Sequence, residues 1–137
     1  MSRRHSARLG TLLAAIGLLL WGMPTASAQE SAASSQLEYV YYNGDVVGSV
    51  TWNQVPAGST PGDSMMVCDL KSDGWAIEAD LFRTGVVERT VNTRGHNAVY
   101  CSPWASGNLQ ENLGWVIHVN MVNGSNTRHV HTMNVNS

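Results

Sequence analysis

Three histidines near the end of the chain have the type and spacing that best fit a transition-metal site. His129 and His131 lie two residues apart, so a β-strand through them places both imidazoles on one face. A hairpin turn of two or four residues within 123–126 adds His118 to that face. Three imidazoles on adjacent strands can bind zinc or copper, so the pattern defines a candidate metal site.

The apolar pattern around these histidines favours a different hairpin. A turn with an odd number of residues, five in the simplest case, pairs Ile117 with Met133 and Trp115 with Val135. This register buries more apolar surface than the even turn does, and it places His118 on the opposite face from the other two histidines. We therefore expect surface or half-buried histidines and no metal ion or other cofactor.

Four carboxylates form a second candidate site. If residues 63–82 form a hairpin whose second strand pairs with the strand that follows, Asp69 faces Glu78 and Asp80 faces Glu88. Like charges directly opposite each other destabilise a sheet. A calcium ion, which binds several oxygen ligands, would relieve the repulsion, and so would a basic partner surface. The simpler interpretation is an acidic face that water and salt screen.

The dipeptide Asp73-Gly74 predicts the turn of that hairpin, because glycine accepts the positive φ angle of a tight turn. The flanking residues alternate between apolar and polar types. This alternation gives one buried face with three apolar pairs: Leu70 with Ile77, Cys68 with Ala79, and Met66 with Leu81. The register points Cys68 into the core.

Turn signals continue along the chain. Asn43-Gly44 predicts a hairpin within 37–52, and residues 83–85 predict a three-residue turn that ends in glycine. No segment after residue 28 has the 3.6-residue period of an ordinary helix. About seven or eight short strands indicate a single all-β domain over 37–137, an antiparallel sandwich or barrel.

The first residues predict export. Three arginines precede an apolar run over 12–23 and small residues at 26–28, which is typical of a signal peptide cleaved after residue 28. The run is too short to span a bilayer. We expect a secreted, extracellular protein with a flexible tail over 29–36 and no membrane attachment after cleavage.

Cleavage makes the mature chain acidic. It retains five basic and ten acidic residues, a formal net charge of −5. Binding to a phosphate backbone depends on clusters of lysine and arginine. We therefore expect no nucleic-acid partner.

The two cysteines, Cys68 and Cys101, predict one disulfide bond. An even number of cysteines in an exported protein favours a disulfide over a reactive thiol. Closing a loop of this length stabilises a small domain by about 3–4 kcal/mol in the chain-entropy interpretation.

Two tryptophans in or beside predicted loops, Trp52 and Trp104, are candidate ligand contacts. Such rings stack on sugars or anchor a protein partner. The alternative is that each ring covers one end of the hydrophobic core.

Three segments resemble a group of small exported proteins of filamentous actinobacteria that have no established activity. The segments are M-V-C-D-L-K-S-D-G-W at 66–75, C-S-P-W-A-S-G-N-L at 101–109, and the late apolar hairpin that contains Val122-Asn123-Gly124. The resemblance spans roughly 64–135. Members of the group commonly carry additional cysteines in the last hairpin. This chain departs from them there, because it has His118, His129 and His131 instead, and a second disulfide is therefore absent.

No nucleophile, phosphate-binding or metalloprotease motif accompanies these features. We expect a secreted, non-catalytic binding protein whose partner is an extracellular protein or a glycan. Two alternatives remain open at this point: a metal-binding protein or metalloenzyme that uses the histidine hairpin, and a secreted inhibitor of an extracellular hydrolase. The sequence leaves the oligomeric state open.

Overall fold

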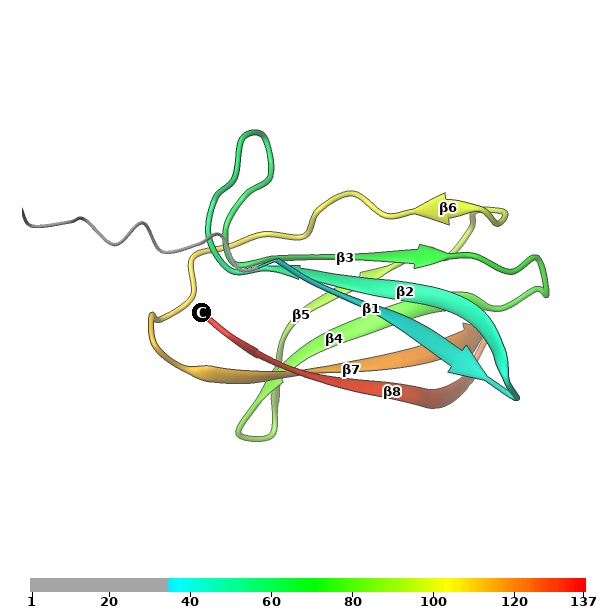
Figure 1. Cartoon of the computed structure of the whole chain (residues 1–137). Coiled ribbons are helices and arrows are strands. Elements are labelled where there is room, and N and C mark those ends of the chain that lie inside the picture. Colours follow the sequence, from blue (N-terminus) through cyan, green and yellow to red (C-terminus); the bar gives the residue numbers. More distant parts are fainter. Residues whose placement is uncertain (1–34) are drawn as a thin grey trace, which may run out of the picture. The chain divides into compact units, whose positions relative to one another are not determined.

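The chain folds into two four-stranded antiparallel sheets packed face to face (Figure 1). The computed structural model describes residues 35–137, and these contain eight strands and no helix that could cross a membrane. The predicted signal peptide over 1–28 and residues 29–34 of the predicted tail lie outside the described residues. In chain order the strands are β1 (Ser35–Tyr42), β2 (Asp45–Asn53), β3 (Ser64–Asp69), β4 (Ala76–Arg83), β5 (Val86–Asn92), β6 (Tyr100–Cys101), β7 (Gly114–Asn123) and β8 (Asn126–Asn136).

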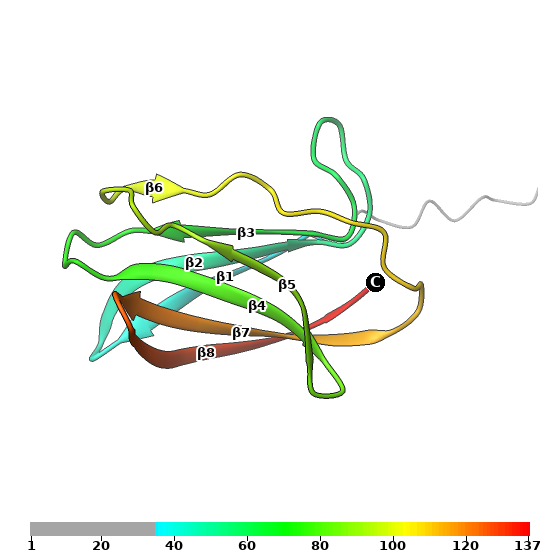
Figure 2. The ribbon, with the colours of Figure 1, turned by 180° about the vertical axis from the view of Figure 1, so that it is seen from behind.

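The strand order is β1-β2-β3-β6 in the first sheet and β5-β4-β7-β8 in the second. The β1–β2, β4–β5 and β7–β8 connections are hairpins within one sheet. The β3–β4, β5–β6 and β6–β7 connections cross between the sheets, as the view from behind also shows (Figure 2). The all-β prediction is confirmed, and two separate sheets make the domain a sandwich.

The inner faces of both sheets form one hydrophobic core. Its largest fully buried side chains are Trp52, Met65, Ile77, Leu81, Ile117, Met121 and Met133. Each such side chain stabilises the fold by about 1.5–3 kcal/mol through removal from water. The indole N–H groups also find partners, because Trp52 Nε1 donates to the Asn136 carbonyl at 3.0 Å and Trp115 Nε1 donates to Ser137 Oγ at 3.2 Å.

The predicted central hairpin is wrong, although its turn signal is real. Gly74 has a φ angle of +79°, but the 70–75 connection carries the chain from the first sheet to the second. β3 pairs with β2 and β6, while β4 pairs with β5 and β7. The apolar rows of β3 and β4 therefore meet across the core instead of side by side, and both are buried without pairing to each other.

The phase of β3 differs from the prediction as well. Met65 and Val67 point inward and are fully buried, so Met66 and Cys68 point to the outer face. Cys68 is nevertheless shielded, with 7 % of its surface exposed, because its neighbour on the edge strand covers it.

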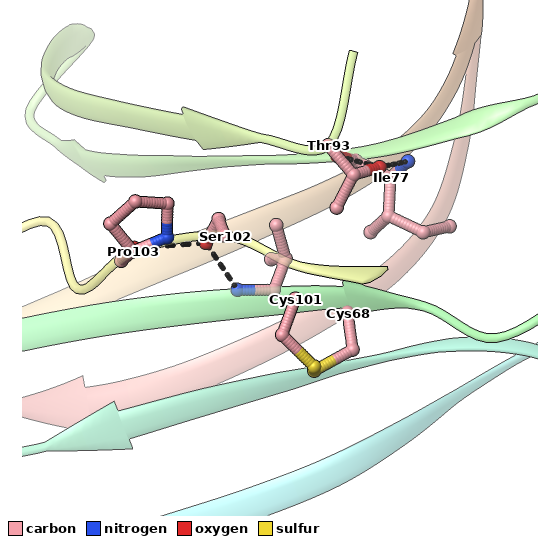
Figure 3. The surroundings of a disulfide bond; sticks show 7 residues. Cys68, Ile77, Thr93, Cys101, Ser102 and Pro103 are labelled. Carbon is pink, nitrogen blue, oxygen red and sulfur yellow. Dashed lines mark hydrogen bonds between the residues drawn. A yellow bond between two sulfur atoms is a disulfide. The ribbon is translucent and has the colours of Figure 1, made fainter. Parts of the chain in front are cut away.

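That neighbour is Cys101, and the predicted disulfide between Cys68 and Cys101 is confirmed (Figure 3). The two cysteines are directly opposite each other on β3 and β6. β6 has only two residues, and it gains a further attachment through Ser102, which donates its N–H to the Val67 carbonyl at 2.9 Å and accepts the Val67 N–H through Oγ at 3.2 Å.

The hairpins follow the predicted turns with local corrections. Asn43 and Gly44 have positive φ angles of 52° and 86°, as a two-residue turn requires. The β4–β5 turn also has two residues, Thr84 and Gly85, with φ angles of 49° and 87°. It is therefore shorter than the predicted three-residue turn.

In the last hairpin the predicted pairs are right and the predicted turn is wrong. Ile117 pairs with Met133 and Trp115 with Val135, as expected. The turn itself is even, because Asn123 pairs with Asn126 across two residues. A bulge supplies the odd residue: Val119 faces His131 and Asn120 faces His129, which leaves Val130 extra.

The segment between β6 and β7 closes the sandwich beside β5. Leu109 in this segment joins the core, and its N–H donates to Asp63 Oδ2 at 3.0 Å. Arg89 of β5 donates from Nη1 to the carbonyls of Asp63 and Ala105. Burial lowers the pKa of Arg89, while the nearby charge of Asp63 acts in the opposite direction.

The disulfide has a measurable consequence for stability. Replacing both cysteines, by Cys68→Ala with Cys101→Ala, releases a cross-link between residues 33 positions apart. We expect the free energy of unfolding, measured by denaturant titration, to fall by about 3–4 kcal/mol. Reducing agent should destabilise the native chain similarly and leave the double variant unchanged. A loss of less than about 1 kcal/mol would contradict this assignment.

Candidate functional site

The predicted acidic face does not assemble. Asp69 ends β3 in the first sheet, on the inner side and 4 % exposed, whereas Glu78 and Asp80 lie on β4 of the second sheet. The prediction is wrong here because it rested on pairing β3 with β4. Glu78 instead accepts the Nε–H of Arg94 through Oε2 at 2.9 Å.

A bulge separates the remaining pair of carboxylates. Leu81 faces Arg89 and Phe82 faces Val87, so Glu88 is the extra residue of β5 and is exposed. Asp80 therefore faces Thr90 rather than Glu88, and its Oδ1 accepts the Thr90 hydroxyl at 2.5 Å. Directly opposed like charges are absent from this part of β4 and β5, so no repulsion calls for a calcium ion there.

The bulge at Val130 also changes the histidine site. His129 lies on the outer face beside His118, with ring centroids 5.4 Å apart and the rings edge-on. His131 turns to the other side of β8, where its Nε2 lies 2.5 Å from Glu38 Oε2 on β1. The expected separation of His118 from His131 is right, but the shared face for His129 and His131 is wrong.

On the outer face of the second sheet, the rings of His118 and His129 both contact other side chains of the protein. His118 stacks on Phe82, with centroids 5.3 Å apart. The two ring nitrogens of His129 lie 3.3 Å from Asn120 Oδ1 and 3.0 Å from Thr132 Oγ1. Within residues 35–137 no three histidine, cysteine or acidic side chains are arranged to hold a metal ion.

The two candidate tryptophans have different environments. Trp52 is 1 % exposed and belongs to the core, so the structure contradicts its predicted role as a ligand contact. Trp104 is half-buried in the segment between β6 and β7. Its contact with a ligand stays a prediction.

Sequence reasoning missed an apolar row on the first strand. Leu37, Tyr39 and Tyr41 alternate along β1 and are 56 %, 52 % and 57 % exposed. We call these three residues the β1 row. Val46 of β2, directly opposite Tyr41, extends it and is 38 % exposed. The signal was present in the alternation L-x-Y-x-Y, but alternation does not say which of the two faces is covered.

The position of β1 makes this row accessible from two directions. β1 is an edge strand, so one side of its backbone has no strand neighbour among residues 35–137. Its single charged side chain, Glu38, points the other way and contacts His131 of β8. The row is therefore uncharged, and it borders a line of backbone N–H and C=O groups that can pair with another strand.

The other long edge strand has a different character. β8 exposes polar side chains along its outer face: Thr127, His129, Thr132 and Asn134. Charged and polar edges resist pairing with other chains. The contrast identifies β1 as the edge at which an apolar contact can form.

Zinc addition tests the separation of the histidines. Because His131 lies on the other side of β8, we expect an equimolar zinc addition to leave the melting temperature of the mature chain unchanged. Binding to the folded state alone would raise it. A rise that His118→Ala and His131→Ala each abolish would show that the three imidazoles converge in solution and would contradict the bulge.

Asp69 provides a second prediction, on stability against pH. Burial raises the pKa of its carboxyl above the ordinary value, and the hydrogen bond from the Lys71 N–H at 3.1 Å opposes this only in part. The folded state thus holds the proton more tightly than the unfolded chain does. The stabilising effect of protonation is complete below the ordinary pKa and is lost as the pH rises through the raised one.

Asp69→Asn removes the charge and keeps an oxygen for the Lys71 N–H. We expect the variant to melt at a higher temperature than the native chain at pH 7, with a difference that shrinks toward pH 3. Thermal unfolding monitored by circular dichroism at pH 7 and at pH 3 measures this difference in melting temperature. A variant that melts lower than the native chain at pH 7 would show that the carboxylate stabilises the fold.

Comparison of this chain with protein-family models, with curated proteins and with solved structures finds no match. The assignment of a function therefore rests on the residues and geometry described above.

Proposed function

We propose that this chain is a secreted, non-catalytic binding protein, and that the edge of β1 binds an extended segment of an extracellular protein as an added strand. The observation that carries the proposal is the β1 row. It consists of three large side chains, each more than half exposed, on a strand whose outer edge is unpaired within the described residues. The leader pattern and the disulfide support the extracellular setting.

An exposed apolar row on an edge strand is unfavourable for a protein that acts alone. Soluble proteins seldom expose contiguous apolar surface, and they usually protect edge strands with charge or proline. β1 has neither protection on its outer face, because Glu38 lies on the other face beside His131. Burial of the row by a partner would remove this apolar surface from water, and tyrosine is among the residues that contribute most to binding energy at interfaces.

The chemistry of the row favours a protein partner over a glycan. Leu37 and Val46 add aliphatic surface to the two tyrosines, and the row carries no carboxylate or amide that would fix the hydroxyl groups of a sugar. The unpaired backbone groups of β1 are complementary to the backbone of another extended chain. In this mode of recognition main-chain hydrogen bonds supply affinity and alternate side chains supply specificity.

The β1 row can be tested by substitution. In the variant Leu37→Thr, Tyr39→Thr and Tyr41→Thr, the β-branched replacements favour the strand while removing the apolar surface. We expect the immobilised mature chain to retain a protein from the producer's own culture supernatant, and the variant to retain at least about tenfold less. Amide hydrogen exchange of β1 should slow when the partner binds.

A matched variant on the other edge serves as the control. Thr127→Ser, Thr132→Ser and Asn134→Ser changes three exposed positions of β8 and should leave retention unchanged. Equal retention by the β1 variant, or exchange that slows elsewhere and not in β1, would overturn the proposal. Retention on polysaccharide columns that depends on the β1 row would favour a glycan instead.

A further inference from the structure

A cleft with a volume of about 470 Å³ lies at one end of the sandwich. Three connections form its walls: the β3–β4 connection, the β5–β6 connection and the β7–β8 turn. Figure 1 shows these connections at the same end of the sheets. The volume falls within the range of roughly 300–1,000 Å³ that is typical of small-molecule sites, and the site is separate from the β1 row.

The side chain that sets this cleft apart is Asp69. It lines the cleft although it is 4 % exposed. Its Oδ1 accepts the N–H of Lys71, and its Oδ2 has no hydrogen-bond partner among the described residues. Since no fully buried side-chain oxygen or nitrogen in residues 35–137 lacks a partner, Oδ2 retains some accessible surface in a residue that lines the cleft. A buried carboxylate with one free oxygen strongly favours a ligand that donates hydrogen bonds.

The charges around the cleft disfavour an anionic ligand. Lys71 Nζ lies 2.7 Å from Asp45 Oδ2 and Arg94 Nε lies 2.9 Å from Glu78 Oε2, so both cations are already paired. Because both basic residues are paired, they offer an anion no compensation for the charge of Asp69. A neutral ligand with several hydroxyl groups suits the acceptor Asp69 and meets no repulsive charge there.

Trp75 adds an apolar wall to this polar site. The half-buried ring lines the cleft. Its position is supported by the guanidinium of Arg128, which lies 5.1 Å from its centroid and 4.6 Å from that of Tyr42. The amides of Asn97 and Asn123 also line the cleft and supply both donors and acceptors. An aromatic ring beside a carboxylate and amides offers an apolar surface for C–H groups and polar groups for hydroxyls.

From these observations we infer that the cleft binds a neutral saccharide, with Asp69 Oδ2 accepting a sugar hydroxyl and Trp75 contacting the apolar face of the ring. The inference is independent of the β1 row, because the two sites share no residue. Loss of binding at one site would leave binding at the other unchanged.

The test uses the isotope-labelled mature chain and a panel of neutral sugars: glucose, galactose, mannose, N-acetylglucosamine and the disaccharides cellobiose and lactose. We expect at least one of them to shift the backbone amide resonances of 69–76 and 93–98 in a saturable manner at millimolar concentration. Glucuronate, which carries the disfavoured negative charge, should bind more weakly than its neutral parent glucose.

Two variants locate the contact. Asp69→Asn and Trp75→Ala should each weaken binding by about ten- to a hundredfold. Asp63→Asn, which alters another mostly buried carboxylate at the opposite end of the sandwich, should leave it unchanged. The melting temperature of Asp69→Asn separates a loss of binding from unfolding, and we expect it to be at least that of the native chain. No saturable shift with any sugar of the panel, or unaltered affinity in Asp69→Asn, would overturn the inference.

Discussion

The apolar rows of β3 and β4 face each other across the core, and most of the architecture depends on this contact. Met65 and Val67 point inward from the first sheet, and Ile77 and Leu81 point inward from the second. Opposition across the core buries each row completely, whereas pairing within one sheet would leave both rows in need of further cover. The chain must then cross between the sheets at 70–75. This crossing places Asp69 inside the cleft and turns Cys68 to the outer face, within reach of Cys101.

Single-residue bulges decide which side chains reach each surface. The extra residue Val130 packs against the core, which gives a physical reason for the bulge: it buries an additional apolar side chain. The same bulge reverses the phase of β8 and separates His129 from His131. The extra residue Glu88 has the corresponding effect in β5, where it removes a carboxylate from its expected position opposite Asp80. In the second sheet the bulges thus preserve the apolar pairs, while polar residues beside each bulge change the face on which they lie.

Two surfaces with different chemistry result from this arrangement. The outer face of the second sheet is polar, and its carboxylates and imidazoles are engaged with the Thr90 hydroxyl, the Asn120 amide and the Arg94 guanidinium. The outer face of β1 is apolar and uncharged, because Glu38, the one charged residue of β1, lies on the other face beside His131. The polar groups of the second sheet therefore have few hydrogen-bonding atoms left for a new partner. The β1 row and Oδ2 of Asp69 have no partner among the described residues and can still bind one.

The sequence alone determined the features that depend on neighbouring residues or on simple counts. These are the all-β class, the turns at Asn43-Gly44 and Gly74, the disulfide between the two cysteines, and the apolar pairs Ile117–Met133 and Trp115–Val135. Only the tertiary structure decided that β3 and β4 belong to different sheets, because alternation shows that a strand has an apolar face but not which strand covers it. The histidine site required a register without a bulge, and the extra residue Val130 was enough to separate its members. The acidic face required β3 and β4 to pair, which the strand order excludes, and the extra residue Glu88 also separated its second pair of carboxylates. The β1 row and the cleft at Asp69 arise where the strand order leaves an edge unpaired or a connection bridges the two sheets, and strand order is a property of the whole chain.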